Sequence, residues 1–404
     1  MPAESAGFRP EARGNDVTDA QLSAIELQPI WYNQHMSSMN LKRRDFFKIA
    51  GAAAAGLAVG QAASVSAKPI DPPYPAPLPA SGEDFVPARV LAASVPVYSS
   101  LDANNRKLIR SVPRDKTIEV SGEVEGPGPE RNRIWYKTRD GFAYSAWLQK
   151  MEPYRTPQIY TNLGDWGMWI ETIVANAPAH AEPDENSPLR YIYNYGTVFH
   201  ATEAQVDAQG RVWYNTVDEY TSKEDNISPT NHWVPAVLTR KIEEDTWNAT
   251  NPHTPDKRIE IDLGKQLVTC YEGDQAVLTS RCASGASFKI GEEQVDYGTP
   301  RGEFSAILKM PSRHMRAPEA ERGSSAWFDL PGVPWNTFFT YDGIAIHGTY
   351  WHNDYGLPRS HGCVNLPIAA ARWIYFWTNP VAPYQDDFVQ GDVPQVKATQ
   401  ILVT

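Results

Sequence analysis

Cysteine is scarce in this chain, long apolar runs are absent, and basic residues are outnumbered by acidic ones. Only three cysteines occur in 404 residues, which excludes a framework of several disulfides. Lys and Arg total 37 against 48 Asp and Glu, a net charge of −11. This balance argues against a nucleic-acid partner, because phosphate contacts demand clustered positive charge. We expect a partner that is neutral, zwitterionic or cationic.

The longest weakly apolar run lies near the N-terminus. It follows the basic stretch Lys42 to Lys48, covers Ile49 to Val65 with several glycines, and ends in the small-residue pattern Val-Ser-Ala at 65–67. Its apolar part is shorter than the ~20 residues that a membrane span needs. The order of charged, apolar and small residues resembles a twin-arginine export signal.

We therefore expect residues 1–67 to be a disordered leader with a signal peptide. This implies export to the cell envelope, either periplasm or cell wall, and no stable membrane span after cleavage. Translation from Met1, Met36 or Met39 stays open, and so does cleavage itself.

Export changes how the cysteines are interpreted, because an oxidising exterior normally pairs them. Cys270 and Cys282 flank a predicted hairpin of residues 266–271 and 275–282. In that hairpin the two sulfurs lie several residue rises apart, at ~3.4 Å each. No disulfide is expected between them. Cys363 is left as a free thiol kept for its reactivity.

A spacer and two small β modules are expected before the C-terminal region. Residues 68–87 are proline-rich, which favours extended polyproline II. Residues 88–153 hold short apolar runs between Gly, Asn, Asp and Pro, the spacing of a small barrel. Their succession resembles bacterial SH3-like domains. Residues 165–243 repeat this pattern more weakly, with residues 211–216 matching residues 133–138. This internal repeat predicts a second SH3-like module.

The aromatic residues of these modules have two interpretations. Trp135, Tyr144 and Trp233 are candidate contacts for a glycan or peptide of the cell wall. Buried aromatics also dominate small β cores, and we favour that interpretation for Trp135 and Trp213. Whether the modules bind the wall stays open. An insertion is expected in the second module around residues 221–231.

Residues 257–404 are predicted to form a mostly-β domain with one main helix. Residues 258–263 alternate strictly between apolar and polar, as a half-buried strand does. Pro367 to Trp377 carries an apolar stripe with proline near its first turn, which predicts a helix. Further strands are expected at residues 302–310, 327–330, 337–340, 344–346, 363–366 and 395–404.

The charged stretch 312–325 has two interpretations, a lid or substrate loop and a solvated connection. The predicted fold class is mainly β. It consists of two small SH3-like barrels followed by a mixed, mostly-β domain whose main helix follows Cys363.

One segment, Ile344 to Leu366, concentrates chemically useful residues: one cysteine and three histidines. His347 lies where a short buried strand runs into a polar loop, and the loop returns through residues 360–362 to Cys363. A nucleophilic cysteine needs a nearby base, and this arrangement can supply one. We predict that Cys363 is the working residue.

Three short motifs in this region occur together: T-P-R-G at 299–302, I-H-G-T at 346–349 and S-H-G-C-V-N at 360–365. In an exported chain they resemble the L,D-transpeptidase catalytic domain of the YkuD type, a cysteine acyltransferase of bacterial peptidoglycan. The resemblance covers roughly residues 257–404. Many members of that family carry Arg where this chain has Asn365.

The resemblance implies a role for each motif residue. Cys363 is the nucleophile, and His347 rather than the adjacent His361 is the general base. The backbone carbonyl of Gly348 orients the imidazole, and the backbone N–H groups of Gly362 and Cys363 are the expected oxyanion donors. Residues expected to shape the site or contact substrate are Ser360, His361, Asn365, Thr349 and Tyr350.

The implied reaction has two steps and needs no cofactor. The thiolate attacks the amide between the third residue of a peptidoglycan tetrapeptide stem and its terminal D-Ala, and D-Ala leaves. An amine of a second stem then attacks the thioester, which gives a 3→3 cross-link. Water as acceptor would make the protein an L,D-carboxypeptidase instead. Carbapenems are expected to acylate the cysteine. The acceptor, the third stem residue and the oligomeric state stay open.

Two hypotheses from other classes compete. His347, His352, His361 and Cys363 together offer nitrogen and sulfur ligands for zinc, although their spacing matches none of the paired zinc patterns. A wall-binding protein without activity is the other alternative. The presence of both His347 and Cys363 argues against it, so we predict an enzyme with no metal in its site.

Overall fold

The computed structural model describes residues 85–404, except residues 115, 130, 218–230, 291, 318–326 and 392–396. The predicted leader, signal peptide and most of the proline-rich linker lie outside the described residues. So do most of the insertion predicted at 221–231 and the second half of the stretch 312–325. Among the described residues, no helix has the length and apolar character to cross a membrane.

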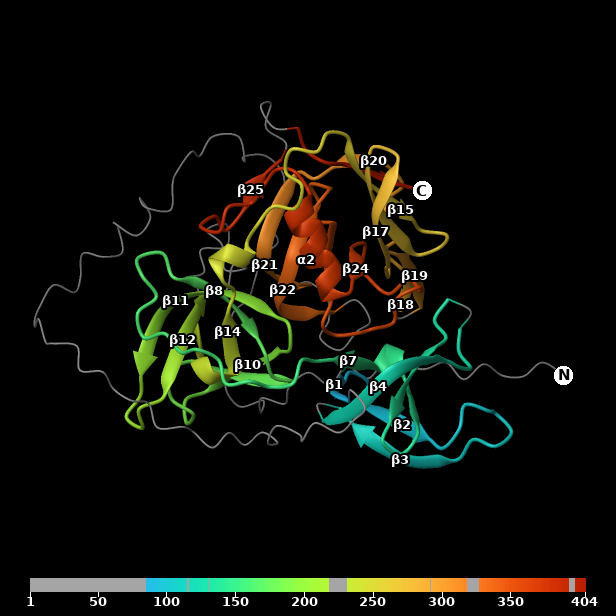
Figure 1. The fold of residues 1–404 in the computed structure, drawn as a ribbon, viewed down its shortest axis with the longest axis horizontal. Coiled ribbons are helices and arrows are strands. Elements are labelled where there is room, and N and C mark those ends of the chain that lie inside the picture. Colours follow the sequence, from blue (N-terminus) through green and yellow to red (C-terminus); the bar gives the residue numbers. More distant parts are fainter. Residues whose placement is uncertain are drawn as a thin grey trace, which may run out of the picture. The chain divides into compact units, whose positions relative to one another are not determined.

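Two seven-stranded antiparallel sheets precede the C-terminal region (Figure 1). The first, module 1, contains β1 (Val86–Val90), β2 (Ser94–Tyr98), β3 (Leu108–Pro113), β4 (Thr117–Glu125), β5 (Ile134–Thr138), β6 (Phe142–Tyr144) and β7 (Leu148–Lys150). The second, module 2, contains β8 (Met168–Thr172), β9 (Asn176–His180), β10 (Leu189–Asn194), β11 (Val198–Val206), β12 (Val212–Val217), β13 (Asn231–Pro235) and β14 (Thr239–Lys241).

The two modules share one strand order. Module 1 runs β3-β2-β6-β5-β4-β1-β7, and module 2 runs β10-β9-β13-β12-β11-β8-β14. A short 3-10 helix precedes the last strand in each, Ser145–Trp147 in one and Ala236–Leu238 in the other. The two segments that the sequence pairs as a repeat therefore fall on β5 and β12, which hold the same place in their sheets. The SH3-like character of both modules stays a prediction.

The aromatic residues of the modules are buried. Trp213 has no exposed surface and Trp135 is 5% exposed, which confirms the core interpretation for both. The indole N–H of Trp135 donates to the Pro127 carbonyl at 2.8 Å. Tyr144 and Trp233 are buried as well. Binding of a glycan through the rings of Trp135, Tyr144 and Trp233 is therefore wrong, because a stacked sugar needs an exposed ring face.

The C-terminal region contains two five-stranded sheets, a hairpin and α2 (Ile368–Trp377). The first sheet runs β17 (Gln275–Arg281), β16 (Leu267–Glu272), β15 (Lys257–Asp262), β26 (Gln400–Val403) and β20 (Gly302–Ser305). The second runs β24 (Val364–Leu366), β23 (Ala345–Gly348), β22 (Asp329–Phe338), β21 (Leu308–Arg316) and β25 (Val389–Gln390). The hairpin is β18 (Ser287–Ile290) with β19 (Glu293–Asp296).

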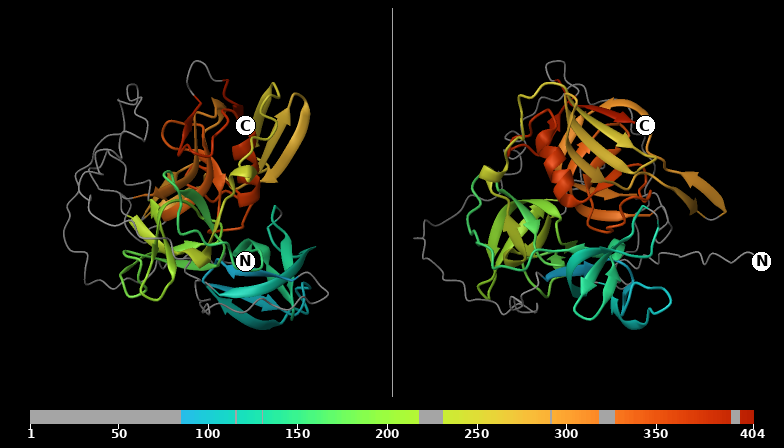
Figure 2. Two further views of the ribbon diagram at one scale, coloured as in Figure 1. Left: turned by 60° about the vertical axis from the view of Figure 1, so that its left-hand side comes forward. Right: turned by 45° about the vertical axis from the view of Figure 1, so that its right-hand side comes forward.

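This architecture confirms the mainly-β fold class and the one main helix after the cysteine, whereas the SH3-like barrels stay a prediction. Both sheets and α2 can be followed from two further sides in Figure 2. Two pairs of strands are parallel, β15 with β26 and β23 with β24. All described residues belong to one compact unit.

Two strand predictions were wrong in this region. The strand expected at 302–310 is split into β20 and β21, and β21 continues to Arg316 through the first part of the stretch expected to be irregular. The strands expected at 327–330 and 337–340 are one strand, β22, which contains Pro331 and Pro334. Proline is tolerated there because most of β22 pairs only with β21, across a register shift near Arg313.

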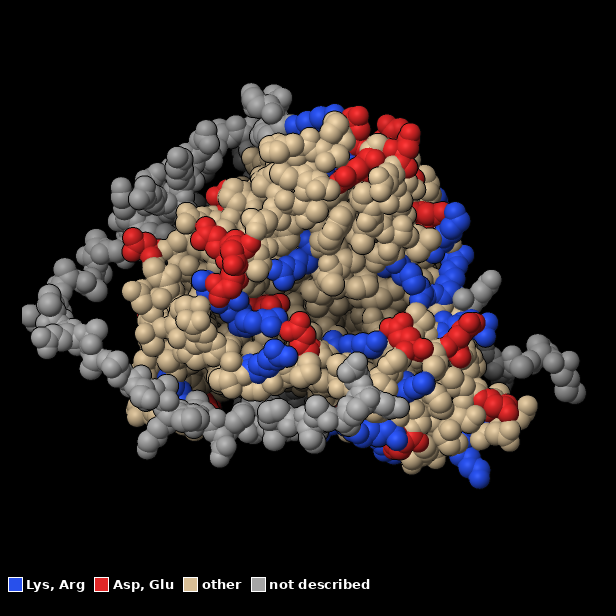
Figure 3. Space-filling view, viewed as in Figure 1, with Lys and Arg blue, Asp and Glu red and all other residues tan. Residues whose placement is uncertain are grey.

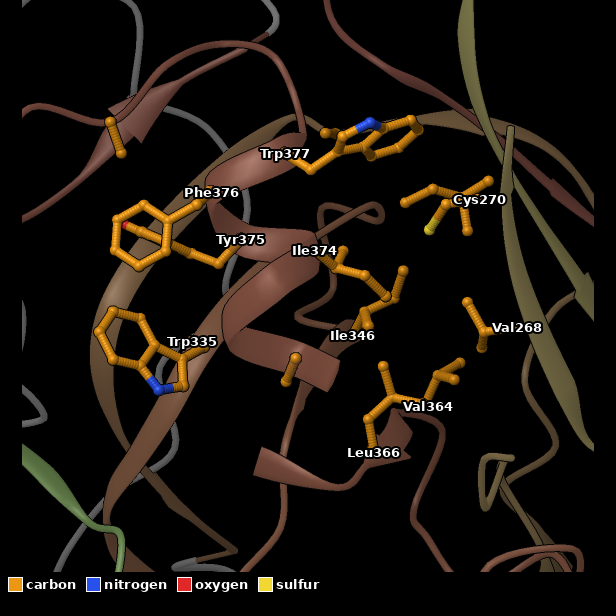
Figure 4. Packing of buried hydrophobic residues seen from close by; sticks show 14 of the residues in the cluster. Val268, Cys270, Trp335, Ile346, Val364, Leu366, Ile374, Tyr375, Phe376 and Trp377 are labelled. Carbon is orange, nitrogen blue, oxygen red and sulfur yellow. The ribbon is translucent and has the colours of Figure 1, made fainter. Parts of the chain in front are cut away.

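The core of the C-terminal region lies around α2. Figure 4 shows Ile374 of α2 on the side of Cys270 of β16, whereas Tyr375 faces Trp335 of β22. The rings of Trp335 and Tyr375 lie 5.4 Å apart, centroid to centroid. One helix therefore packs against strands of both sheets, and the apolar face of β23 and β24 closes the same core.

The carboxyl end of α2 is fixed by two buried lysines. Lys257 donates to the Trp377 carbonyl at 2.8 Å. Lys309 donates to the carbonyls of Thr378 at 2.8 Å and Pro380 at 2.7 Å. The last carbonyls of a helix lack intrahelical donors, and the N–H groups of the two lysines supply them. Burial lowers the pKa of Lys309 well below its usual value.

Cys270 and Cys282 are buried free thiols. Cys270 faces Leu278 across the hairpin of β16 and β17, and the Cys282 N–H donates to the Gln266 carbonyl at 2.9 Å. Burial raises the pKa of Cys282 to about 12 and that of Cys270 further. Both thiols stay protonated and pack as small apolar side chains.

Surface charge is mixed. On the face shown in Figure 3, acidic and basic side chains are interspersed rather than gathered by sign. Exposed ion pairs such as Arg110 with Asp140 and Arg240 with Glu171 contribute to this pattern.

Candidate active site

The parallel pairing of β23 with β24 positions the side chains of the candidate site. Ile346 is paired with Val364 and His347 with Asn365. Ile346 and Val364 both belong to the buried core around α2. Since side chains alternate along a strand, His347 and Asn365 lie on the opposite face. Cys363 directly precedes β24 and shares that face with Asn365.

The Cys363 thiol lies at the border between solvent and an apolar cluster. Its side chain packs against a group formed by Met310, Phe338 and Ala345. The Ala345 N–H points to Sγ at 3.5 Å, and Sγ lies 3.8 Å from the Gly343 carbonyl. Burial raises the pKa of the thiol to about 11, although the Ala345 N–H acts in the opposite direction. At neutral pH the resting residue is therefore a thiol.

His347 is 1% exposed and has a fixed tautomer. Its Nδ1 lies 3.0 Å from the Gly348 carbonyl, an acceptor, so Nδ1 carries the ring proton and Nε2 carries the lone pair. This is the bond that the resemblance implied for Gly348. Burial lowers the pKa of His347 to about 4. The imidazole is thus a neutral base at neutral pH, with Nε2 as its basic atom.

His361 is held among aromatic rings. It stacks on Phe288 of β18 with 4.4 Å between ring centroids and 8° between planes. Tyr297 and Phe328 lie 4.8 and 5.2 Å away. These contacts fix the His361 ring against β18, and its role in shaping the site stays a prediction.

The turn Ser360–Cys363, called the cysteine turn below, is stabilised from within. The Ser360 hydroxyl donates to the Cys363 carbonyl, and the Gly362 N–H donates to Ser360 Oγ at 3.2 Å. Gly362 has φ +115°, a conformation that favours glycine. The Gly362 N–H is therefore already engaged. Its predicted role as an oxyanion donor would require this bond to break.

Buried Asn365 and half-buried His352 form a pair beside the cysteine turn. Asn365 Nδ2 as placed lies 2.9 Å from His352 Nε2, and His352 Nδ1 accepts from the Asp354 N–H at 3.2 Å. Two donors would then face each other, which turning the Asn365 amide over resolves. Because Nδ1 accepts, Nε2 carries the ring proton, and the Asn365 amide oxygen is the matching acceptor. With the amide in this orientation, Asn365 Oδ1 accepts from His352 Nε2, whereas otherwise it has no hydrogen-bond partner. Burial lowers the pKa of His352 to about 3, so this ring is neutral too.

The four proposed zinc ligands have separate surroundings. His347 is bonded to Gly348, His352 lies against Asn365, and His361 stacks on Phe288. Throughout the described ranges, no group of three or more His, Cys, Asp or Glu side chains has the geometry to hold a metal ion.

Thr349 and Tyr350 are both buried, which limits their contact with a substrate. The Thr349 N–H donates to the Leu366 carbonyl at 3.0 Å and so continues the pairing of β23 with β24. The Tyr350 hydroxyl donates to the Pro331 carbonyl at 2.8 Å. Tyr350 begins the loop of residues 350–359, which is named the site loop.

Module 1 anchors the site loop. Arg89 of β1 donates to the Tyr350 carbonyl. The Asn353 N–H donates to the Ala146 carbonyl at 3.1 Å, and Asn132 Nδ2 donates to Asp354 Oδ1 at 2.8 Å. Sequence reasoning missed these residues, because no local pattern marks a contact between segments more than 200 positions apart. The site loop is therefore held in place by hydrogen bonds to module 1.

Replacing Asn132 with Ala is expected to loosen the site loop. Asn132 and Asp354 are both buried, and a hydrogen bond to a charged group contributes about 1.5–3 kcal/mol. Hydrogen exchange of residues 350–359 should become about 10-fold faster or more. The matched control is Arg110→Ala, which removes an exposed pair with Asp140 in the same module. Equal exchange in both variants would contradict the anchoring role.

Taken together, the region is a mainly-β domain in which His347 of β23 and Cys363, directly before β24, lie on one face. Residues 256–392 match the family model of the YkuD L,D-transpeptidase catalytic domain. The chain thus carries an L,D-transpeptidase catalytic domain of the YkuD family at these residues.

Three of the similar solved structures are L,D-transpeptidases of different organisms. The L,D-transpeptidase of Xylanimonas cellulosilytica (residues 123–326) is 22% identical, with 41% of this chain and 71% of that chain covered and a TM-score of 0.26. The Mycobacterium smegmatis L,D-transpeptidase is 15% identical, with 48% and 90% covered and a TM-score of 0.27. The catalytic domain of the E. faecium L,D-transpeptidase, acylated by ertapenem, is 23% identical, with 38% and 99% covered and a TM-score of 0.26. No curated protein matches the chain.

Proposed function

We propose that this protein is an exported cysteine acyltransferase that acts on the tetrapeptide stems of peptidoglycan. The observation that carries the proposal is the register of β23 with β24, which sets a neutral His347 and the Cys363 thiol on one face. The family match at residues 256–392 supports the substrate class. The basic, apolar and small-residue pattern of residues 42–67 supports export through the twin-arginine pathway.

Thioester formation would use both side chains. His347 Nε2 takes the proton of the Cys363 thiol while Sγ attacks the carbonyl of the third stem residue. The tetrahedral intermediate then expels D-Ala, whose amine takes the proton from the imidazolium. The enzyme is left with a thioester at Cys363 and a neutral His347. Because both groups start neutral, the proton moves during the attack and no ion pair needs to form beforehand.

The second step would regenerate the thiol. A side-chain amine of another stem attacks the thioester, His347 accepts a proton from that amine, and the cysteine leaves and is reprotonated. The product is a 3→3 cross-link. Hydrolysis of the same thioester would yield a tripeptide, the product of an L,D-carboxypeptidase.

Carbapenem labelling and product analysis test the proposal. A carbapenem acylates the related E. faecium catalytic domain. The mature protein, residues 68–404, should gain the mass of one ertapenem on Cys363, and Cys363→Ser should gain none. Incubation with disaccharide-tetrapeptide should give a cross-linked dimer with loss of D-Ala by mass spectrometry. A tripeptide alone would favour the carboxypeptidase. No adduct and no product, with stoichiometric zinc by elemental analysis, would contradict the acyltransferase.

A further inference from the structure

Thr299 opens the T-P-R-G turn and reaches the cysteine turn with its hydroxyl. Thr299 is 6% exposed, and its Oγ1 donates to the Gly362 carbonyl at 2.7 Å. The same oxygen accepts from the Gly285 N–H at 2.9 Å. One side chain therefore joins the T-P-R-G turn, the segment after β17 and the turn that carries Cys363.

The bond to Gly362 fixes a peptide plane. The only cis peptide among the described residues is Asn379–Pro380, so the Gly362–Cys363 peptide is trans. In a trans peptide the C=O and the N–H point in opposite directions. Holding the Gly362 carbonyl toward Thr299 therefore turns the Cys363 N–H to the other side of the chain. Glycine restrains this plane little by itself, so the anchor has to come from elsewhere.

The cysteine turn does not supply this anchor. Ser360 accepts from the Gly362 N–H and donates to the Cys363 carbonyl, which belong to the two flanking peptides. The peptide between them is held at its carbonyl by Thr299. Because the Gly362 N–H is engaged by Ser360, the Cys363 N–H is the better placed donor for a developing oxyanion.

Close packing keeps the Thr299 hydroxyl in place. A Cβ built on Gly285 would lie 2.6 Å from the Thr299 N atom and 2.1 Å from the Tyr297 carbonyl oxygen. Only glycine permits this approach. The segment after β17 is itself tied to the cysteine turn, because Gly285 forms an isolated bridge with Ser360.

We propose that Thr299 is a positioning residue, whose hydroxyl orients the Gly362–Cys363 peptide so that the Cys363 N–H stabilises the oxyanion formed during acylation. The inference rests on the acyltransferase function proposed above. It assigns to the first residue of the T-P-R-G turn a role in the rate of thioester formation.

Two reactions of the same thiol separate this role from a purely structural one. Acylation by ertapenem passes through an oxyanion, whereas alkylation by iodoacetamide displaces iodide and forms none. Thr299→Val keeps the shape of the side chain and removes the hydroxyl. Removal of an oxyanion donor costs about 10²–10³ in rate, and a misdirected donor should cost less. We expect acylation to slow about 10- to 100-fold and alkylation to stay within about twofold of wild type.

Thr299→Ser is the conservative variant and should restore acylation to within about threefold. Thr378→Val is the matched control, because the Thr378 hydroxyl is also buried and donates to a backbone carbonyl, that of Tyr375, at 3.3 Å. Its ratio of acylation to alkylation should equal that of wild type. If Thr299→Val does not fold by circular dichroism, Thr299→Ala is measured by the same ratio.

An unchanged ratio of acylation to alkylation in Thr299→Val overturns the inference, whether neither rate falls or both fall equally. These results leave the acyltransferase intact, because wild type is still acylated. If wild type itself is not acylated, the proposed function fails and the role of Thr299 fails with it.

Discussion

Replacement of His347 by Gln should slow acylation of Cys363 by ertapenem about 10²- to 10⁴-fold, the usual contribution of a positioned general base. The pKa of the Cys363 thiol is raised to about 11, so very little thiolate exists at pH 7 without help. His347 Nε2 is the basic atom on the same face, because Nδ1 is engaged by Gly348. Glutamine keeps a polar side chain of similar length but cannot take up the proton.

The matched control for this variant is His361→Phe. Phenylalanine preserves the stack on Phe288 and removes the second imidazole of the region. Stopped-flow or mass-spectrometric acylation rates should fall less than about 10-fold, well below the range of a lost general base. The reverse result, with fast acylation in His347→Gln and slow acylation in His361→Phe, would assign the base to His361. Circular dichroism of both variants checks that each is folded.

The strand that carries His347 and the helix after Cys363 could be predicted because their signals are local. Two isoleucines flank Ala345 directly before His347, and a proline followed by an apolar stripe marks α2. Such patterns depend on neighbours within one or two turns or strand steps. The predicted helix at 367–377 and the observed helix Ile368–Trp377 differ by one residue.

The choice between His347 and His361 could not be made from strand alternation. Residues two apart on a strand share a face, so alternation alone would place His361 beside Cys363. The structure separates them because β24 begins only at Val364, and the cysteine turn before it directs His361 to Phe288. The motif resemblance supplied this choice at the level of sequence.

Contacts between distant segments were beyond the sequence. Thr299 and Gly362 are bonded across 63 positions, and Asn132 and Asp354 across 222. Hydrophobic periodicity reports which face of an element is buried and carries no information on which segment covers it. For the same reason two strands were expected where β22 is continuous through Pro331 and Pro334. Whether a proline removes a ladder hydrogen bond depends on the neighbouring strand, which the local pattern does not reveal.

The rate of alkylation of Cys363 by iodoacetamide should rise about tenfold per pH unit from pH 7 to about pH 9.5. Below its pKa of about 11, the fraction of thiolate grows tenfold with each unit. A thiolate and imidazolium pair formed in the resting enzyme would instead give a rate that levels off near neutral pH. Mass mapping separates Cys363 from Cys270 and Cys282, which are buried with even less thiolate.

Acylation by ertapenem should follow a different pH profile. It needs the neutral form of His347, whose pKa is lowered to about 4 by burial. The base is therefore fully available above about pH 5, and the acylation rate should be nearly flat from about pH 5 to about pH 9. Below about pH 4 the acylation rate should fall tenfold with each pH unit. Rates of both reactions on one preparation measure the two groups separately. A bell-shaped acylation profile centred on pH 6–7 would contradict this, because it would place the imidazolium in the resting enzyme. The flat profile follows from the burial of His347 and Cys363. Two neutral side chains have a small free energy of desolvation, whereas a thiolate and imidazolium pair has a large one. The imidazolium therefore forms only while the sulfur attacks the substrate carbonyl.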